Sequence, residues 1–114
     1  MGIATAVIAN ADDFQRALNT KHPVFLLFVS QHCPACADAT PLFELIAGNY
    51  PWVVSLVLDT AQTPRHPEVK GTPTLLIYLD GKLMEILKGF GPEEDQANLV
   101  EQTFKRYATA RQPA

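Results

Sequence analysis

The residues with the clearest chemical potential are two cysteines, Cys33 and Cys36. They enclose Pro34 and Ala35 and follow the apolar run Val24–Val29, after which a helical pattern begins. Two thiols at this spacing on the first turn of a helix can close a small disulfide ring. The first thiol would also lie where free backbone N–H groups and the positive end of the helix dipole stabilise a thiolate. The spacing therefore predicts a reactive pair.

Other uses of the pair fit less well. A disulfide between Cys33 and Cys36 closes almost no loop, so it would add little stability by restricting the unfolded chain. A metal-binding module using both cysteines and His32 is an alternative, but a structural zinc site needs four ligands and the sequence has no second cysteine pair. We therefore expect neither a metal nor a cofactor.

Composition narrows the class of protein. With 114 residues, 47% of them hydrophobic and 18% charged, the chain fits one globular domain over 1–114. The net charge of −3 and the lack of a basic patch argue against nucleic acid as a partner. No apolar stretch approaches the roughly 20 residues that span a bilayer, and the N-terminus is a poor signal peptide. We expect a cytoplasmic monomer that does not bind membranes.

The pattern along the chain predicts an α/β fold in the order β-α-β-α-β-(α)-β-β-α. The second and third apolar runs have no alternation, which indicates strands covered on both faces by helices. Asp80-Gly81 predicts a tight hairpin. Expected strands are 5–9, 24–29, 52–58, 74–79 and 82–87; expected helices begin after Asn10 or Asp12, after the cysteines and at Pro92, with a short helix or a loop in 60–70.

A core can be predicted from the same pattern. We expect five apolar residues of the strands and of the helix after the cysteines to be buried: Phe28, Leu45, Val54, Leu56 and Leu76. On the last helix, the apolar stripe consists of Leu99, Val100, Phe104 and Tyr107.

Several further residues follow a known arrangement. A proline, Pro41, lies inside the helix that follows the cysteines, and Thr72 and Pro73 stand at the entrance of a strand. Together with the two cysteines, the hairpin and a glycine (Gly89 or Gly91) after the last strand, these residues resemble the thioredoxin family over about 5–108. The resemblance implies a central mixed sheet of about five strands flanked by about four helices, with a cis Pro73 facing the cysteines.

The family's chemistry gives each of these residues an expected role. The resemblance implies a thiol–disulfide oxidoreductase that cycles Cys33 and Cys36 between dithiol and disulfide. Cys33 would attack a protein substrate to form a mixed disulfide, and a buried Cys36 would resolve it. The backbone of Thr72, before Pro73, would pair with an extended substrate segment. The implied partners are protein thiol or disulfide substrates and an unidentified recycling partner.

The sequence also departs from thioredoxins at four places. His32 replaces the usual Trp before the first cysteine, Pro34-Ala35 replaces Gly-Pro, Leu27 replaces a buried acid, and Ser55 replaces a lysine near that acid. These departures keep a second function open, a redox-linked binding or chaperone module with little turnover.

The roles of the remaining candidates depend on geometry. His32 either tunes Cys33 or is a solvated loop residue, whereas His22 and His66 are expected in surface loops. Pro34, Pro73 and Phe90 are candidates for an apolar docking surface. For Phe90 a place in the core is an equal alternative.

Overall fold

The computed structural model describes residues 3–5 and 11–109 of the chain. Its strands are β1 (Ile3–Thr5), β2 (Val24–Val29), β3 (Val54–Asp59), β4 (Thr74–Leu79) and β5 (Lys82–Lys88). Its helices are α1 (Ala11–Leu18), α2 (Pro34–Ala47) and α3 (Glu93–Ala108). The strands form one sheet in the order β1-β3-β2-β4-β5, in which β1, β3 and β2 are parallel and the last two pairings are antiparallel. The predicted mixed sheet of five strands is confirmed.

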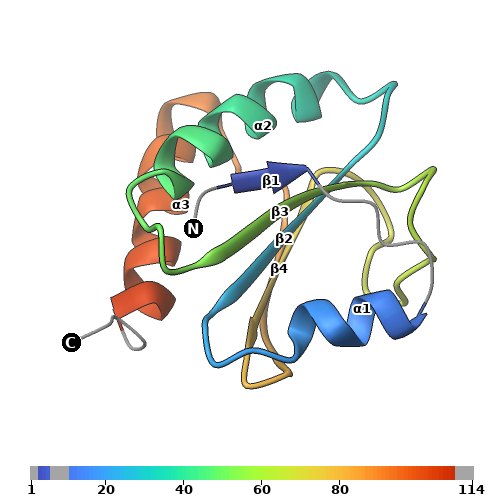
Figure 1. Ribbon diagram of the computed structural model, residues 1–114. Coiled ribbons are helices and arrows are strands. Elements are labelled where there is room, and N and C mark those ends of the chain that lie inside the picture. Colours follow the sequence, from blue (N-terminus) through green and yellow to red (C-terminus); the bar gives the residue numbers. More distant parts are fainter. Residues whose placement is uncertain (1–2, 6–10, 110–114) are drawn as a thin grey trace.

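Helices cover both faces of the sheet, with α1 on one side and α2 and α3 on the other (Figure 1). Successive side chains of β2 therefore enter two different cores. Phe25 and Leu27 pack in the cluster that α2 and α3 cover, and Leu26 and Phe28 pack in the cluster on the α1 side. This is why the sequence of β2 is continuously apolar rather than alternating.

The hairpin between β4 and β5 has the predicted geometry. Asp80 and Gly81 have φ angles of 53° and 78°. Positive φ at both central residues is what a two-residue hairpin of the primed type requires, and Gly meets that requirement without steric cost. The hairpin places the start of β5 beside the end of β4, at the edge of the sheet far from the cysteines.

The helix count is lower than expected, because the described residues contain three helices rather than four. Residues 60–73 form turns and loops. Pro64 and Pro67 remove two backbone donors from this short polar stretch, which explains the absence of a helix there. Asp12 lies inside the first turn of α1 rather than at its cap. The alternative cap, Asn10, and most of the strand predicted over 5–9 lie outside the described residues.

The core prediction is right for Phe28 and Leu76 and wrong for Leu45, which is 73% exposed. The buried residues of α2 include Phe43, Ile46 and Ala47. Leu45 is two positions, about 200°, from Phe43 around the helix, so it faces solvent.

Val54 and Leu56 are partly rather than fully buried. They pack against the cluster on the α1 side. A single helix of eight residues covers that face, so it shields less of β3 than two helices shield on the opposite face.

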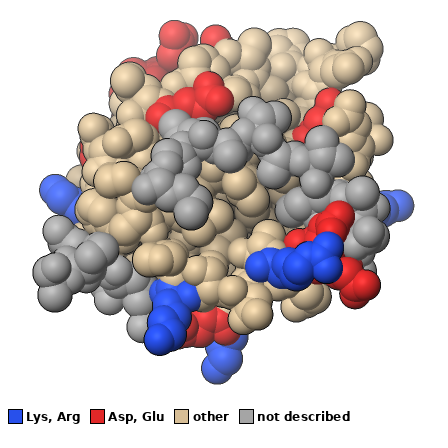
Figure 2. Space-filling model, viewed as in Figure 1, with Lys and Arg blue, Asp and Glu red and all other residues tan. Residues whose placement is uncertain are grey.

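On the face shown in Figure 2, the charged side chains of the described residues lie in small separate groups with other residues between them. Among the helices that the structure describes, none is long and apolar enough to cross a membrane.

Candidate active site

The two cysteines lie where β2 ends and α2 begins. Cys33 is the N-cap of α2, with an extended backbone (φ −123°, ψ 97°), and Pro34 occupies the first turn. Proline suits this position because its missing N–H would have no helical partner there. The Cys33 sulfur accepts a hydrogen bond of 3.1 Å from the backbone N–H of Cys36. The helix start thus directs a backbone amide at the first sulfur, as the sequence predicts, and the same N–H also donates to the Cys33 carbonyl at 3.0 Å.

The pair is oxidised and its two members differ in accessibility. Cys33 and Cys36 form a disulfide, with 5.2 Å between their Cα atoms. Cys36 is 4% exposed, whereas Cys33 is partly exposed. A reagent in solution can therefore approach Cys33 and not Cys36. Of the backbone N–H groups in the first turn, that of Ala35 makes no hydrogen bond to the Cys33 sulfur within the described part of the chain.

The segment with Thr72 and Pro73 lies at the same edge of the sheet as the cysteines. The end of β2 pairs with the start of β4 through Phe28 and Thr74, which brings the two segments together. The Thr72–Pro73 peptide bond is cis, in agreement with the resemblance. The carbonyl of the buried Pro73 accepts a hydrogen bond of 2.9 Å from the N–H of Gly89.

A hydroxyl pair links the cysteine loop to this segment. The Oγ atom of Ser30 and the Oγ1 atom of Thr72 are 2.9 Å apart. No feature of the sequence indicates this contact of Ser30, since a serine after an apolar strand is an ordinary start of a loop. The contact depends on a pairing between residues that are far apart in the chain, which no local pattern reveals.

The other residues predicted near the cysteines face solvent. His32, Pro34 and Ala35 are exposed. The side chain of His32 makes no hydrogen bond or ion pair with any residue that the structure describes. Phe90 is 3% exposed and belongs to the core, so it does not line a docking surface.

Two buried residues occupy the positions where the resemblance would put an acid and a lysine. Leu27 is fully buried and packs in the cluster that also contains Ala39 and Phe43 of α2. The Oγ atom of Ser55 is buried, and it has no hydrogen-bond partner in the part of the chain described. The two positions where the family carries an acid and a lysine thus hold an apolar side chain and an unpaired hydroxyl.

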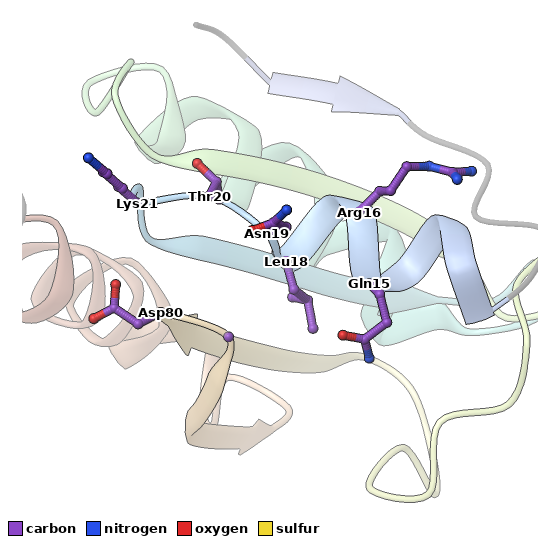
Figure 3. A pocket seen from close by; sticks show the side chains of 8 residues that line it. Gln15, Arg16, Leu18, Asn19, Thr20, Lys21 and Asp80 are labelled. Carbon is purple, nitrogen blue, oxygen red and sulfur yellow. The ribbon is translucent and has the colours of Figure 1, made fainter.

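A second feature, a hollow on the surface, is elsewhere. It has a volume of about 760 Å³ and lies between the end of α1 and the hairpin (Figure 3). In the figure, Leu18 and Gln15 extend into the space between α1 and β4, whereas Arg16 and Lys21 extend away from it. Because Tyr78 at the end of β4 pairs with Val24 at the start of β2, this hollow is at the opposite edge of the sheet from the cysteines.

Residues that could bind a metal do not gather at the site. Among the described residues, no group of three His, Cys, Asp or Glu side chains is arranged to hold a metal ion.

Comparison with known proteins agrees with this geometry. The family model described as Thioredoxin matches residues 5–102. The chain belongs to the thioredoxin family. It is a thiol–disulfide oxidoreductase, as its curated relatives indicate.

Two relatives and one solved structure illustrate the similarity. The thioredoxin of Staphylococcus saprophyticus is 30% identical over 106 residues, which cover 89% of this chain and 97% of the relative. The thioredoxin of Chlamydia muridarum is 32% identical over 80 residues, covering 68% and 78%. The oxidised form of mitochondrial thioredoxin 3 from Saccharomyces cerevisiae superposes with a TM-score of 0.74 at 19% identity, covering 93% of this chain and 94% of that one.

Proposed function

We propose that the enzyme exchanges disulfides with protein substrates through a mixed disulfide, with Cys33 as the attacking thiol. The thiolate of Cys33 attacks one sulfur of a substrate disulfide, a Cys33–substrate bond forms, and the second substrate sulfur leaves as a thiolate. Cys36 then attacks the Cys33 sulfur and releases the substrate as a dithiol. Two electrons pass to the substrate, and a redox partner must return two electrons to the Cys33–Cys36 disulfide.

The observation that carries this proposal is the unequal accessibility of two bonded sulfur atoms at the start of a helix. The partly exposed Cys33 can meet a large substrate, and the buried Cys36 can reach only the sulfur beside it. The helix N-terminus and the Cys36 amide favour a thiolate at Cys33 over one at a free cysteine.

Thr72 is the proposed point of contact with the substrate polypeptide. Its side chain is partly exposed, and its backbone N–H and carbonyl make no backbone hydrogen bond with other described residues. An extended substrate segment can therefore pair with these groups beside Cys33, as a strand adds to the edge of a sheet. Pro73, which is buried below, holds this segment against the sheet.

A trapping experiment tests the mechanism. In Cys36→Ser the resolving thiol is missing, so a substrate with a disulfide should remain covalently bound to Cys33. The complex should migrate as one species on a non-reducing gel and separate when dithiothreitol reduces the mixed disulfide. Cys33→Ser serves as the matched control and should form no such complex. Trapping by Cys33→Ser alone would reverse the assignment of the two cysteines.

A second candidate function is a redox-linked binding module with little turnover. The buried Leu27 and the unpaired Ser55 hydroxyl favour it, because neither can accept the proton of Cys36 as a buried carboxylate can. Reduction of insulin under saturating dithiothreitol distinguishes the two functions. Sustained turnover supports the oxidoreductase, and a single stoichiometric reaction supports the binding module.

The same residues lead to a prediction about the reduction potential. A carboxylate at the position of Leu27 would repel a nearby thiolate and favour the thiol, whereas leucine does not. Stabilising the thiolate stabilises the reduced form, and one pKa unit corresponds to about 30 mV for a two-electron couple. Thioredoxin lies near −270 mV, so we expect this pair between about −240 and −180 mV.

Equilibration with glutathione redox buffers measures this potential. Leu27→Asp should lower it by about 30 mV or more, and Leu27→Asn, which is similar in size but uncharged, should change it much less. A wild-type value at or below about −270 mV would contradict the argument.

A further inference from the structure

His66 is enclosed by three aromatic rings on the α1 side of the sheet. The centroid of its ring lies 5.5 Å from that of Phe14 in α1, 6.1 Å from that of Phe28 in β2 and 6.5 Å from that of Tyr78 in β4. It is partly buried rather than a free surface residue, which corrects the expectation from the sequence. A histidine between two prolines in a polar loop gave no local sign of this packing.

The hydrogen bonds of His66 determine which of its two ring nitrogens carries the proton. The backbone N–H of Glu68 lies 3.0 Å from Nδ1, and an amide can only donate, so Nδ1 must be the acceptor and carry no proton. In the neutral ring the proton then sits on Nε2, which donates to the hydroxyl of Tyr78 at 2.7 Å. A second proton on the ring would place two donors face to face at Nδ1 and break the bond to Glu68.

This ring lies in the segment that leads to Thr72. The N–H of Val69 bonds the carbonyl of His66 at 3.0 Å, and the hydroxyl of Thr74 bonds the carbonyl of Gly71 at 2.7 Å. Residues 66–73 are therefore attached to β4 at both ends, through Tyr78 at one end and Thr74 at the other. Protonation of the ring breaks the bond from the Glu68 N–H to Nδ1 and loosens this end of the segment, while Nε2 still donates to Tyr78. The other end stays attached through the Ser30–Thr72 contact and the bond from the Gly89 N–H to the Pro73 carbonyl.

We propose that neutral His66 is a positioning residue for the substrate-binding segment 71–73, and that capture of polypeptide substrates weakens when His66 gains a proton. The inference rests on the proposed contact between Thr72 and the substrate backbone. His66 touches neither the cysteines nor the substrate; it acts through the segment that it holds.

The surroundings of His66 favour the neutral ring near neutral pH. Burial lowers the pKa of His66 below its ordinary value, and the nearby Glu68 carboxylate opposes this with a smaller effect. Burial, with a further contribution from Glu68, raises the pKa of Tyr78, so its hydroxyl stays protonated in the range where histidine titrates. Phe14 and Phe28 carry no charge. Arg65, which is exposed, is the charged residue that lines the cavity of about 220 Å³ beside His66.

The test compares two substrates across pH. Insulin offers a polypeptide to Thr72, whereas bis(2-hydroxyethyl) disulfide offers only sulfur chemistry at Cys33. Dividing kcat/KM for insulin by kcat/KM for the small disulfide removes the titration of Cys33 itself. The measurement is made in a His32→Gln background, so that the histidine beside Cys33 does not contribute.

We expect this ratio to fall by about 3- to 10-fold on acidification from about pH 7.5 to pH 5, the scale of one lost hydrogen bond. His66→Gln keeps a donor for Tyr78 and does not titrate, so its ratio should be independent of pH. Tyr78→Phe keeps the ring and removes the acceptor, so it should raise KM for insulin by about 3-fold or more at pH 7.5 with kcat and the reduction potential unchanged. His22→Gln, at an exposed position, is the control and should follow the wild-type profile.

Two results would overturn the proposal. The first is an insulin-to-small-disulfide ratio that does not change with pH in the protein that keeps His66, and the second is a ratio that still falls on acidification in His66→Gln. NMR of the imidazole nitrogens gives an independent readout, which must show the Nε2–H tautomer at neutral pH; the opposite tautomer would also overturn it. If Cys36→Ser traps no substrate, the proposed function itself fails. If Cys36→Ser traps substrate but the ratio does not depend on His66, only the role of His66 fails.

Discussion

Replacing Cys33 with serine is expected to lower the rate of insulin reduction by at least about 10³-fold, the scale on which loss of a nucleophile lowers an enzyme's rate. The hydroxyl of serine cannot attack a disulfide or form one with Cys36. The remaining thiol, Cys36, is 4% exposed and faces the protein interior, so it cannot replace the missing nucleophile. The measurement is the initial rate of insulin precipitation under dithiothreitol, corrected for the reaction without protein.

Alkylation of the two single-cysteine variants provides the matched control. Iodoacetamide should modify Cys33 in Cys36→Ser at least about tenfold faster than it modifies Cys36 in Cys33→Ser, because it reacts with accessible thiolate. Circular dichroism should show that both variants are folded. Equal rates of alkylation would mean that burial does not separate the roles of the two cysteines.

The parts of this site that could be predicted from the sequence are those determined by neighbouring residues. An apolar strand, a pair of cysteines and a helix start follow one another in the chain, so the place of Cys33 at the N-cap of α2 was visible in the order of residues. The hairpin at Asp80-Gly81 is local in the same sense. Thr72 and Pro73 were found through resemblance, since their approach to the cysteines depends on the pairing of β2 with β4.

What the sequence did not reveal depends on contacts between distant segments or on the direction of a side chain. The bond between Ser30 and Thr72 joins two loops that are 42 positions apart. His66 meets rings from three different elements, and its polar neighbours in the chain suggested only a loop. Leu45 shows the second kind of limit. It has apolar residues near it in the sequence of α2, but it lies about 200° around the helix from the buried Phe43, so its apolar type alone does not place it in the core.

Phe104 of α3 lies at the centre of the hydrophobic core that supports the site. Its ring stacks on that of Phe25 in β2, with centroids 4.2 Å apart and an interplanar angle of 18°, and on that of Tyr50, at 5.3 Å and 16°. It also meets Phe43 of α2 at 5.6 Å. Phe104 thus joins α3, α2 and the central strand, and it is fully buried.

Phe104→Ala should therefore lower the free energy of unfolding by about 3–5 kcal/mol, since it removes buried surface and leaves a cavity that three rings border. This is a large part of the 5–15 kcal/mol that typically stabilises a domain, and urea unfolding followed by fluorescence measures it. Leu45→Ala is the matched control on α2. It removes a side chain that is 73% exposed and replaces it with the best helix former, so its effect should stay within about 0.5 kcal/mol. A loss below about 1 kcal/mol for Phe104→Ala would mean that the rings rearrange to fill the space, and that α3 is not fixed to the sheet through this residue.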